Sequence, residues 1–566
     1  MSAPENTTNG GSGGCDINDK TKRDSSAADD GSTTVSDPSK RSKNTSLLQE
    51  VINPTIYSKY FVDMERSLND DDGINNTFRE EYATATPYKH GHLKDLFHPT
   101  FITKVKDEVK QQSKVKFKES DLFRVYQSID LGNLSSALVP TTKGEGGSCA
   151  TPNNEDELIK LIESIPNVMK LRDVLYSQEF KSFIEYIAGL PPSTLSMSNQ
   201  VDCAFNCHAP GCHLLCHDDV IGTRKISYII YLTEDNWILE QEGGALELYP
   251  RQHDDGDKND DNGQLSPVPT KRVSPIFNSM AFFEVVPGVS YHSVQEVIGE
   301  RPRLSLQGWY HASKPPDNME QATLQQLKKV AAKPSATAAA EQSGGTGTTK
   351  KGDNEVEAPA EGVDTGNSGN ESSVLSESDK EYLSKYIQDV YLTEESMNNI
   401  RQKFEEDSSV QLVNFLQTKW VPKQPPKDGK QQHCYDDSYY TNGTSSEWRL
   451  QGPAHKQRYL LYQDNPDQTD DCHIIGSLLH HVQTKLFESV QFQNYLCYIT
   501  SLDPYTGIDS SSIRRFRPGL DYTVAHYGLL LPSDKSVLDA TMCFVQDDAQ
   551  DDKDLWQSGD VGKFSI

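Results

Sequence analysis

Apolar residues are concentrated in short runs between positions 224 and 311. The runs are rich in β-branched and aromatic residues and are bounded by charge, glycine or proline, which is typical of strands. They predict strands at residues 224–232, 243–250, 278–285, 289–297 and 303–311. Because the gaps are short apart from one insertion, we expect an antiparallel jelly-roll barrel, in which strands distant in sequence meet across the mouth.

Helical spacing precedes this region. Between residues 156 and 190, apolar residues recur at steps of three and four until Gly189 and Pro191 end the pattern. We expect these helices to support the barrel. The fold class that follows is mainly β with flanking helices (α+β).

The candidate chemistry lies just before and within the predicted barrel. Side chains on a strand repeat every two residues, so His217 and Asp219 would share one face and could bind one metal. A second strand would add His292. Two imidazoles and one carboxylate leave coordination positions open, which suits non-heme Fe(II) and its reaction with O2. Arg303, on the same predicted strand face as Ser305, could clamp the distal carboxylate of an iron-bound 2-oxo acid, and this predicts 2-oxoglutarate as co-substrate.

Several motifs carry a resemblance to a known family. They are Leu214-Leu215-Cys216-His217-Asp218-Asp219, Gly243-Gly244-x-Leu246-x-Leu248-Tyr249, Phe282-Phe283-Glu284-Val285, His292-x-Val294 and Arg303-Leu304-Ser305-x-x-Gly308-Trp309. Over residues 50–315 the chain resembles the ribosomal prolyl hydroxylases, which are 2-oxoglutarate and Fe(II)-dependent oxygenases with a double-stranded β-helix. They hydroxylate a proline of the small-subunit ribosomal protein at the decoding centre. Fungal members are linked to translation termination and to mRNA poly(A) tails, and some add a second hydroxyl at C4.

The resemblance implies the catalytic centre residue by residue. His217, Asp219 and His292 would be the iron ligands. The implied cofactors are Fe(II), 2-oxoglutarate, O2 and L-ascorbate. The implied reaction is 3-hydroxylation or 3,4-dihydroxylation of a prolyl residue.

The resemblance also implies the co-substrate pocket. Arg303 would hold the distal carboxylate of 2-oxoglutarate, Tyr231 would hydrogen-bond it, and Ser305 would assist. The chain departs from the family at two places: relatives carry a tyrosine where this chain has His208, and an acidic residue where it has Cys212. His208 is therefore a further candidate for the co-substrate pocket.

A dense run of cysteine and histidine leaves an alternative open. It consists of Cys203, Cys207, His208, Cys212, His213, Cys216 and His217, and zinc binds such side chains. Against zinc, the four cysteines lie within 14 residues, without the long connection that usually separates two ligand pairs. The plainer interpretation is that they are small, partly buried residues in a reducing compartment.

Composition divides the chain. Only 35% of residues are hydrophobic, so part of the chain cannot build a core. We expect a disordered tail at 1–45, a catalytic domain at 46–313 with its core barrel at about 200–313 and an acidic loop at 251–275, a disordered linker at 314–375, and a second domain at 376–566.

The second domain has weaker signals. We expect helices at 376–420 and 474–496 and strands at 458–462 and 522–531. Its Arg515-Phe516-Arg517-Pro518-Gly519-x-Asp521-Tyr522-Thr523 motif resembles the family's second barrel. We find no second His-x-Asp motif there and expect a metal-free, non-catalytic barrel that acts as a scaffold or substrate platform. Relatives continue further at their C-terminus, so we expect this second barrel to be incomplete.

The net charge of −28 argues against a protein that binds nucleic acid by neutralising phosphates. It suits a strongly basic partner such as a ribosomal protein. Further expected partners are translation termination factors and poly(A)-binding protein. No membrane-spanning run occurs, and we place the protein in the nucleus and cytoplasm. Two alternatives stay open: a 2-oxoglutarate oxygenase acting on another substrate, and a non-catalytic scaffold linked to translation.

Overall fold

The structure is a computed structural model of the 566-residue chain. It describes residues 47–58, 77–112, 115–120, 122–134, 155–195, 201–252, 264–316, 375–422, 438–464, 473–502, 511–517, 519–524 and 538–544. The predicted tail and nearly all of the predicted linker lie outside these residues. So does the acidic part of the predicted loop, residues 253–263.

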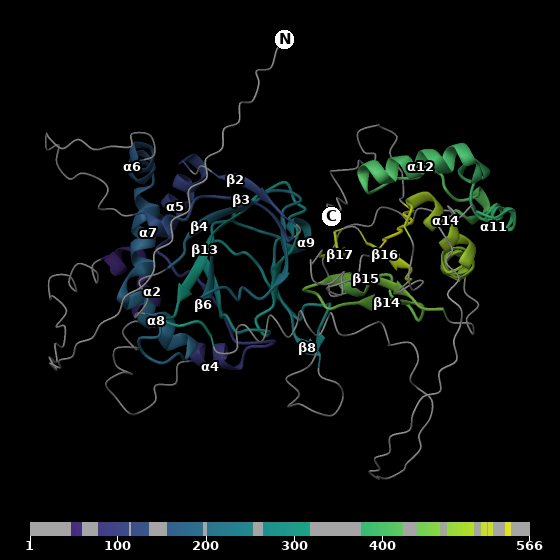
Figure 1. The fold of residues 1–566 in the computed structure, drawn as a ribbon. Helices are drawn as coiled ribbons and strands as arrows, with labels where there is room; N and C mark the ends of the chain where they lie inside the picture. The colour runs from purple at the N-terminus through teal and green to yellow at the C-terminus, as the bar shows by residue number, and fades with distance from the viewer. Residues whose placement is uncertain are drawn as a thin grey trace, which may run out of the picture.

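Eleven of the described strands form one antiparallel sheet that curls into a nearly closed barrel (Figure 1). They are β1 (His90–Lys94), β2 (Lys116–Glu119), β3 (Phe123–Gln127), β4 (Ala204–His208), β5 (His213–His217), β6 (Arg224–Tyr231), β7 (Leu246–Leu248), β10 (Lys271–Val273), β11 (Ser279–Glu284), β12 (His292–Val294) and β13 (Arg303–His311). Neighbours follow the order β1-β11-β6-β13-β4-β3-β5-β12-β7-β10, with β2 beside β3. This order joins strands distant in sequence, which confirms the jelly-roll prediction.

Successive side chains of a strand point in alternate directions, and here they pack into two separate apolar cores. On β6, Ile226, Tyr228 and Ile230 pack with the helices in one large core. Ile229 and Tyr231 belong instead to a smaller core inside the barrel. Because successive side chains of a strand point to opposite faces, one strand can serve both the supporting layer and the barrel interior.

The helices cover one side of the barrel (Figure 1). They are α2 (Pro54–Ile56), α4 (Thr77–Thr84), α5 (Pro99–Gln112), η2 (Leu131–Asn133), α6 (Glu155–Ser164), α7 (Pro166–Tyr176) and α8 (Gln178–Ala188), while α9 (Leu239–Glu242) precedes β7. The predicted helical region at 156–190 is confirmed as three helices. Ser177 caps α8 by accepting from Phe180 N at 3.2 Å, and Gly189 ends it at φ 66°.

The strand predictions need two corrections. The expected strand at 289–297 is only the three residues of β12, because turns and irregular pairing surround it. The segment 251–275 is not a single loop: β8 (Arg251–Gln252) pairs with β9 (Gln264–Leu265), and β10 pairs with β7. Strands β1 to β4 were not predicted, because their short, mixed sequences lack a clear apolar pattern.

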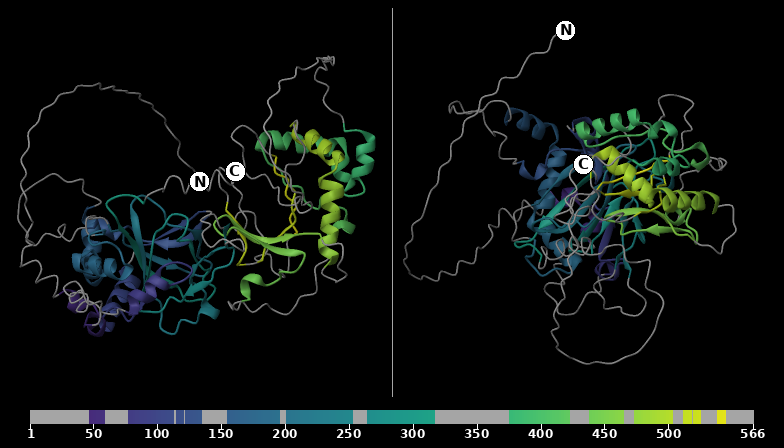
Figure 2. Two further views of the ribbon diagram at one scale, coloured as in Figure 1. Left: turned by 90° about the horizontal axis from the view of Figure 1, so that it is seen from below. Right: turned by 45° about the vertical axis from the view of Figure 1, so that its right-hand side comes forward.

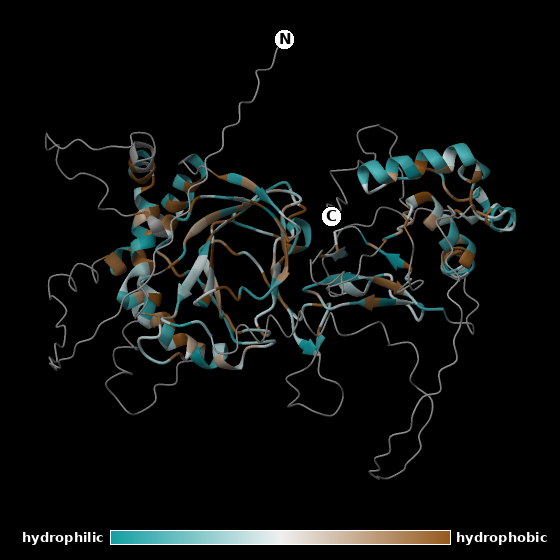
Figure 3. Ribbon diagram, in the orientation of Figure 1, coloured by the Kyte–Doolittle hydropathy of each residue, from teal (hydrophilic) through white to brown (hydrophobic). Residues whose placement is uncertain are grey.

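The second domain combines helices with a small sheet. Its helices are α11 (Glu377–Leu383), η4 (Asp389–Leu392), α12 (Glu394–Asp407), η5 (Thr418–Trp420), η6 (Tyr439–Thr441), α13 (His473–Val482), η7 (Gln483–Phe487) and α14 (Val490–Thr500). Its strands are β14 (Trp448–Gln451), β15 (Gln457–Tyr462), β16 (Arg514–Arg515) and β17 (Tyr522–Thr523). α12 is largely hydrophilic and buries Met397 and Ile400 in the helical core (Figure 3).

Two of the second-domain predictions differ in detail. The expected helix at 474–496 is divided near Ser489, which caps α14 by accepting from Phe492 N. The expected strand at 522–531 is described only over β17, and residues 525–531 lie outside the described ranges. No helix among the described residues is long and apolar enough to cross a membrane.

The second domain lies against one side of the barrel (Figure 2). Cys216, Tyr249 and Tyr291 of the barrel and Leu265 of β9 form one buried cluster with Ala454 of the second domain. The side of the barrel away from its helical layer is therefore also covered by protein.

Candidate metal centre

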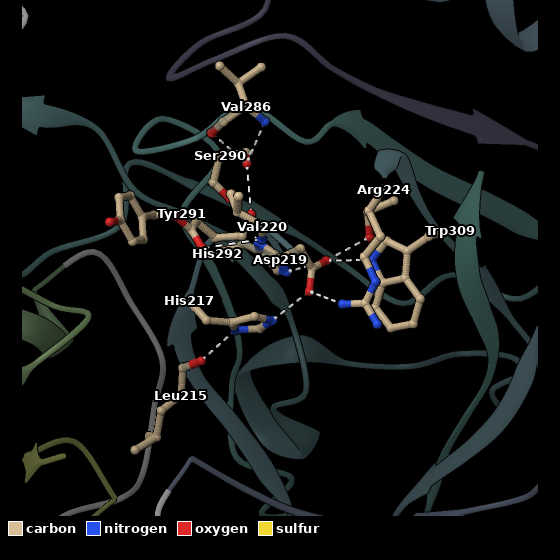
Figure 4. A network of polar contacts seen from close by, with 12 residues as sticks. Leu215, His217, Asp219, Val220, Arg224, Val286, Ser290, Tyr291, His292 and Trp309 are labelled. Atoms are coloured by element: carbon tan, nitrogen blue, oxygen red, sulfur yellow. Dashed lines mark hydrogen bonds and ion pairs between the residues drawn. The ribbon is translucent and has the colours of Figure 1, made fainter. Parts of the chain in front are cut away.

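Three side chains meet in the barrel where β5 and β12 run side by side (Figure 4). His217 ends β5, and its ladder partner is His292, the first residue of β12. Asp219 follows β5 and lies between the two imidazoles, with His217 Nε2 3.1 Å from its Oδ1 and His292 Nε2 3.3 Å from its Oδ2. The potential ligand atoms all lie within 4.8 Å of one another, so they could hold one metal ion.

Asp219 reaches this position by a route that differs from the predicted one. It does not share a strand face with His217, because β5 ends at His217 and the backbone of Asp219 is left-handed, with φ 60°. Aspartate tolerates this conformation better than most residues. The turn carries the carboxylate back to the imidazole, so the pair meets although the strand argument was wrong.

Hydrogen bonds to the backbone orient both imidazoles. His217 Nδ1 lies 2.8 Å from Leu215 O, and His292 Nδ1 lies 2.9 Å from Ser290 O. A carbonyl only accepts, so each Nδ1 donates to the backbone, which turns each Nε2 toward Asp219 as the nitrogen available to a metal. This is the arrangement that a metal-binding histidine needs.

Asp219 is held by further donors that the sequence argument missed. Ser227 Oγ donates to Asp219 Oδ2 at 3.0 Å and Trp309 Nε1 donates to the same oxygen at 2.9 Å. Arg224 stacks on Trp309, with its Cζ 3.5 Å from the ring centroid. Burial opposes ionisation of Asp219, but His292 and His217 hold its pKa well below its usual range. The carboxylate is thus charged and fixed. Inward alternation along β6 and β13 was the signal that could have identified Ser227 and Trp309.

The predicted co-substrate residues lie together on the inner side of the same barrel. Arg303 is fully buried, with its Cζ 5.1 Å from the ring centroid of Tyr231 and its Nη1 3.5 Å from Ser305 Oγ. Among the described residues, Arg303 Nε and Nη2 and Tyr231 Oη have no hydrogen-bond partner. Burying a charge without a partner is costly, so these atoms predict an anionic ligand.

His208 lies beside Arg303 across the β4 and β13 ladder. Its Nδ1 is 3.4 Å from Arg303 Nη1. Burial, followed by the charge of Arg303, holds the pKa of His208 well below its usual range, so the imidazole is neutral. Asn206 lies two residues earlier on β4 opposite Ser305, and its Oδ1 has no partner among the described residues. Asn206 was not predicted as a site residue, although its two-residue spacing from His208 puts it on the same face.

The backbone leaves room for Arg303. A Cβ added to Gly244 would lie 2.9 Å from Arg303 Cδ, and Gly244 has φ 75°. Only glycine meets both demands without strain. The Gly-Gly pair therefore matters for the pocket as well as for the turn.

The cysteines do not form the alternative zinc site. Among the described residues, the only His, Cys, Asp and Glu side chains close enough to hold a metal are the three that meet between β5 and β12. Cys203 belongs to the helix-facing core, and Cys216 packs against the second domain. Burial raises the pKa of Cys203 to about 12 and that of Cys207 to about 11, which favours the thiol form. The plainer interpretation of the cysteines accounts for these positions.

The site fits an iron ion and a 2-oxo acid on its own geometry. Two imidazoles whose Nε2 atoms face one carboxylate form an open set of ligands. An unpaired guanidinium on the same barrel interior offers two donors to a carboxylate. A jelly-roll barrel with this site defines the class of 2-oxoglutarate and iron-dependent oxygenases.

Comparison with known proteins gives the same class of oxygenase and also identifies a family within it. Residues 203–311 match the 2OG-Fe(II) oxygenase superfamily, and residues 378–566 match the family described as oxoglutarate and iron-dependent oxygenase degradation C-term. The chain is 34% identical over 493 residues to "Prolyl 3,4-dihydroxylase OGFOD1" of Ostreococcus tauri, a match that covers 84% of this chain and 82% of the relative. The protein therefore belongs to the OGFOD1 family and is a 2-oxoglutarate- and Fe(II)-dependent oxygenase.

More distant relatives cover less. "Prolyl 3-hydroxylase OGFOD1" of Xenopus laevis is 29% identical over 241 residues, covering 42% of this chain and 38% of that protein. Among solved structures, a Pseudomonas putida prolyl-4-hydroxylase is 15% identical and covers 42% of this chain and 99% of its own, with a TM-score of 0.27. With a score so low, this last likeness adds nothing to the family assignment.

Proposed function

We propose that this protein hydroxylates a prolyl residue of the small-subunit ribosomal protein at the decoding centre, at C3 and then at C4. The observation that carries the proposal is the meeting of His217, Asp219 and His292 in a barrel that also buries Arg303, whose Nε and Nη2 have no partner among the described residues. The match to a prolyl 3,4-dihydroxylase over 84% of the chain supports the choice of prolyl dihydroxylation.

In this proposal the three facing side chains hold iron. His217 and His292 would bind through Nε2 and Asp219 through a carboxylate oxygen. Ser227 and Trp309 keep the Asp219 carboxylate in place by donating to its Oδ2. The protein needs no reorganisation of these groups when the metal binds, because their orientations are already set.

Arg303 would anchor 2-oxoglutarate. Its unpaired Nε and Nη2 suit the distal carboxylate, and the hydroxyl of Tyr231 would donate to the same group. Ser305, His208 and Asn206 would line the remaining pocket. When bound, iron, 2-oxoglutarate and O2 supply the oxidant for a prolyl C–H bond, with release of succinate and CO2, and L-ascorbate keeps the metal in its Fe(II) form.

The partner follows from charge and from the family resemblance. The net charge of −28 would attract a strongly basic ribosomal protein over a distance, which speeds encounter. Modification of the decoding centre would link the protein to translation termination and accuracy. Termination factors and poly(A)-binding protein would be further partners in the nucleus and cytoplasm.

Mass spectrometry tests the proposal directly. A proline-containing peptide from the decoding-centre protein is incubated with the full chain, Fe(II), ascorbate, 2-oxoglutarate and O2. His292→Ala is the control. We expect a gain of two oxygens on proline, absent in the control. A gain of one oxygen would overturn the dihydroxylation. Formation of succinate without oxidation of the peptide would show that the proposed substrate is wrong. If folded, iron-loaded protein forms neither succinate nor oxidised peptide, the proposed hydroxylase activity is wrong.

A further inference from the structure

The strand that carries His292 is short, and it pairs in regular register with β7 but irregularly with β5. β12 has three residues, and its register against β5 shifts between His292 and Val294. His292 faces the metal centre, so the next residue, Ser293, points to the outside of the barrel. A short and irregular strand needs outside contacts if its first residue is to keep a fixed position.

The outer side of β12 is held by a buried carboxylate. Glu247 on β7 is the ladder partner of Ser293 and is only 2% exposed. Its Oε2 accepts from Ser293 Oγ at 2.7 Å and from Tyr249 Oη at 3.1 Å. Ser293 and Tyr249 also lie within hydrogen-bonding distance of each other, at 3.0 Å.

Further support for this carboxylate comes from the second domain. Tyr440 Oη donates to Glu247 Oε1. Arg458 is buried and its Nη1 lies 3.4 Å from Tyr249 Oη, with its Cζ 5.0 Å from the ring centroid of Tyr440. Burial raises the pKa of Glu247 and the charge of Arg458 works against that rise. Without the second domain, the carboxylate would lose the Tyr440 donor and the charge of Arg458, and would keep the charge of Arg272 on the neighbouring strand β10.

The second-domain residues are themselves fixed. Arg517 donates from Nη1 to Tyr440 O and to Asn442 O, each at 2.8 Å. Arg458 donates from Nε to Leu520 O at 2.8 Å. Hydrogen bonds within the second domain therefore hold Tyr440 and Arg458 in place independently of their contacts with the barrel.

The other histidine strand is covered by the same domain. Cys216, next to His217 on β5, packs in one cluster with Tyr249, Tyr291 and Ala454. The ring of Tyr291, next to His292, lies 5.0 Å from that of His455. Both histidines are thus flanked by residues whose other side touches the second domain.

We propose that the second domain positions the metal centre, and that Tyr440 and Arg458 are the positioning residues that act through Glu247 and Ser293 on His292. The inference rests on the proposed role of His217, Asp219 and His292 as iron ligands. It assigns a role in metal binding to a domain in which the described residues include no second group of potential ligands.

Iron titration of the purified full chain under anaerobic conditions tests this inference. Tyr440→Phe removes one hydroxyl and keeps the ring, and Tyr495→Phe is the matched control in the helical core of the second domain, where Tyr495 Oη donates to Tyr391 O. Loss of a group that hydrogen-bonds a metal ligand typically weakens metal binding by about 10–100-fold. Tyr440 acts indirectly, through Glu247 and Ser293, so its effect belongs at the low end of that range. We expect a rise of about tenfold in the iron dissociation constant for Tyr440→Phe and no change for Tyr495→Phe.

Two further measurements separate positioning from general stability. Hydrogen exchange of the metal-free protein should speed up at residues 290–295 in Tyr440→Phe and not in the control. In a double-mutant cycle, Tyr440→Phe and Ser293→Ala should be strongly non-additive in iron affinity, because both act through Glu247. Arg458→Lys, which keeps a cation, should bind iron better than Arg458→Met.

The outcomes distinguish the two proposals. Iron binding by the wild type with equal affinity in Tyr440→Phe and Tyr495→Phe would overturn the positioning role and leave the proposed function intact. Equal weakening in both variants, with exchange faster throughout the chain, would also overturn it. Failure of the wild type to bind iron, when it is folded, would overturn the proposed function itself.

Discussion

Two buried arginines show how the domains differ. Arg303 in the barrel is fully buried, and its Nε and Nη2 have no partner among the described residues. Arg517 in the second domain is 8% exposed, and it donates to both oxygens of Asp521 and to two backbone carbonyls, each at 2.8 Å.

The difference separates a binding residue from a structural one. A buried guanidinium such as that of Arg517, with four of its five N–H donors used, stabilises the chain around it. One with donors left over carries a desolvation cost that only a ligand can offset. Burial alone would have grouped the two arginines together, whereas the hydrogen bonds make Arg517 structural and leave Arg303 with donors for the proposed ligand.

The largest expected effect is the loss of stability when Arg517 is replaced. Arg517→Met leaves the buried Asp521 carboxylate unpaired and frees two carbonyls, so we expect a loss of about 3–5 kcal/mol in the free energy of unfolding. Urea unfolding of the full chain measures this. A loss below the error of the measurement would remove the contrast between the two arginines.

Arg303→Met should weaken binding of 2-oxoglutarate and should not destabilise the fold. We expect the Michaelis constant for 2-oxoglutarate to rise by about 100-fold, since two charge-assisted hydrogen bonds are lost. The free energy of unfolding of the ligand-free protein should rise by about 1 kcal/mol, because an unpaired buried charge is removed. Succinate formation and urea unfolding check the two parts. A variant that unfolds as easily as Arg517→Met would show that Arg303 is structural after all.

Ligand addition tests the binding side of the contrast, because each protein is compared with itself in the absence of ligand. In the presence of a redox-inactive divalent metal, 2-oxoglutarate at about 100 times its dissociation constant should stabilise the wild type by about 2.7 kcal/mol. Arg303→Met should gain almost nothing. Thermal unfolding with and without 2-oxoglutarate measures this, and succinate in place of 2-oxoglutarate serves as the control. An equal stabilisation of both proteins by 2-oxoglutarate would show that it binds at a site other than Arg303.

The smallest expected effect is on the support of the metal ligand. Trp309→Phe removes the Nε1 donor to Asp219, and we expect the iron dissociation constant to rise by about tenfold. Trp448→Phe, in the second-domain sheet, is the matched control and should leave iron affinity unchanged. If both variants bind iron like the wild type, Ser227 alone is sufficient to hold the carboxylate.

The sequence by itself determined the barrel and the identity of the candidate ligands. The apolar runs at β6, β11 and β13 are long enough for strand spacing to be read, and each of these strands was predicted within a residue or two. The His-x-Asp motif pointed to His217 and Asp219, because that pair is a short local pattern. The same holds for helices α6 to α8, whose apolar spacing is regular.

Only the tertiary structure decided how these pieces meet. The left-handed turn at Asp219, the opposition of His217 and His292, and the unpaired Oδ1 of Asn206 depend on the pairing of β5, β12 and β4. Contacts of Tyr440 with Glu247 join residues 193 positions apart. No local pattern encodes such distances, because strand pairing and domain packing are fixed by the total burial and hydrogen bonding of the folded chain.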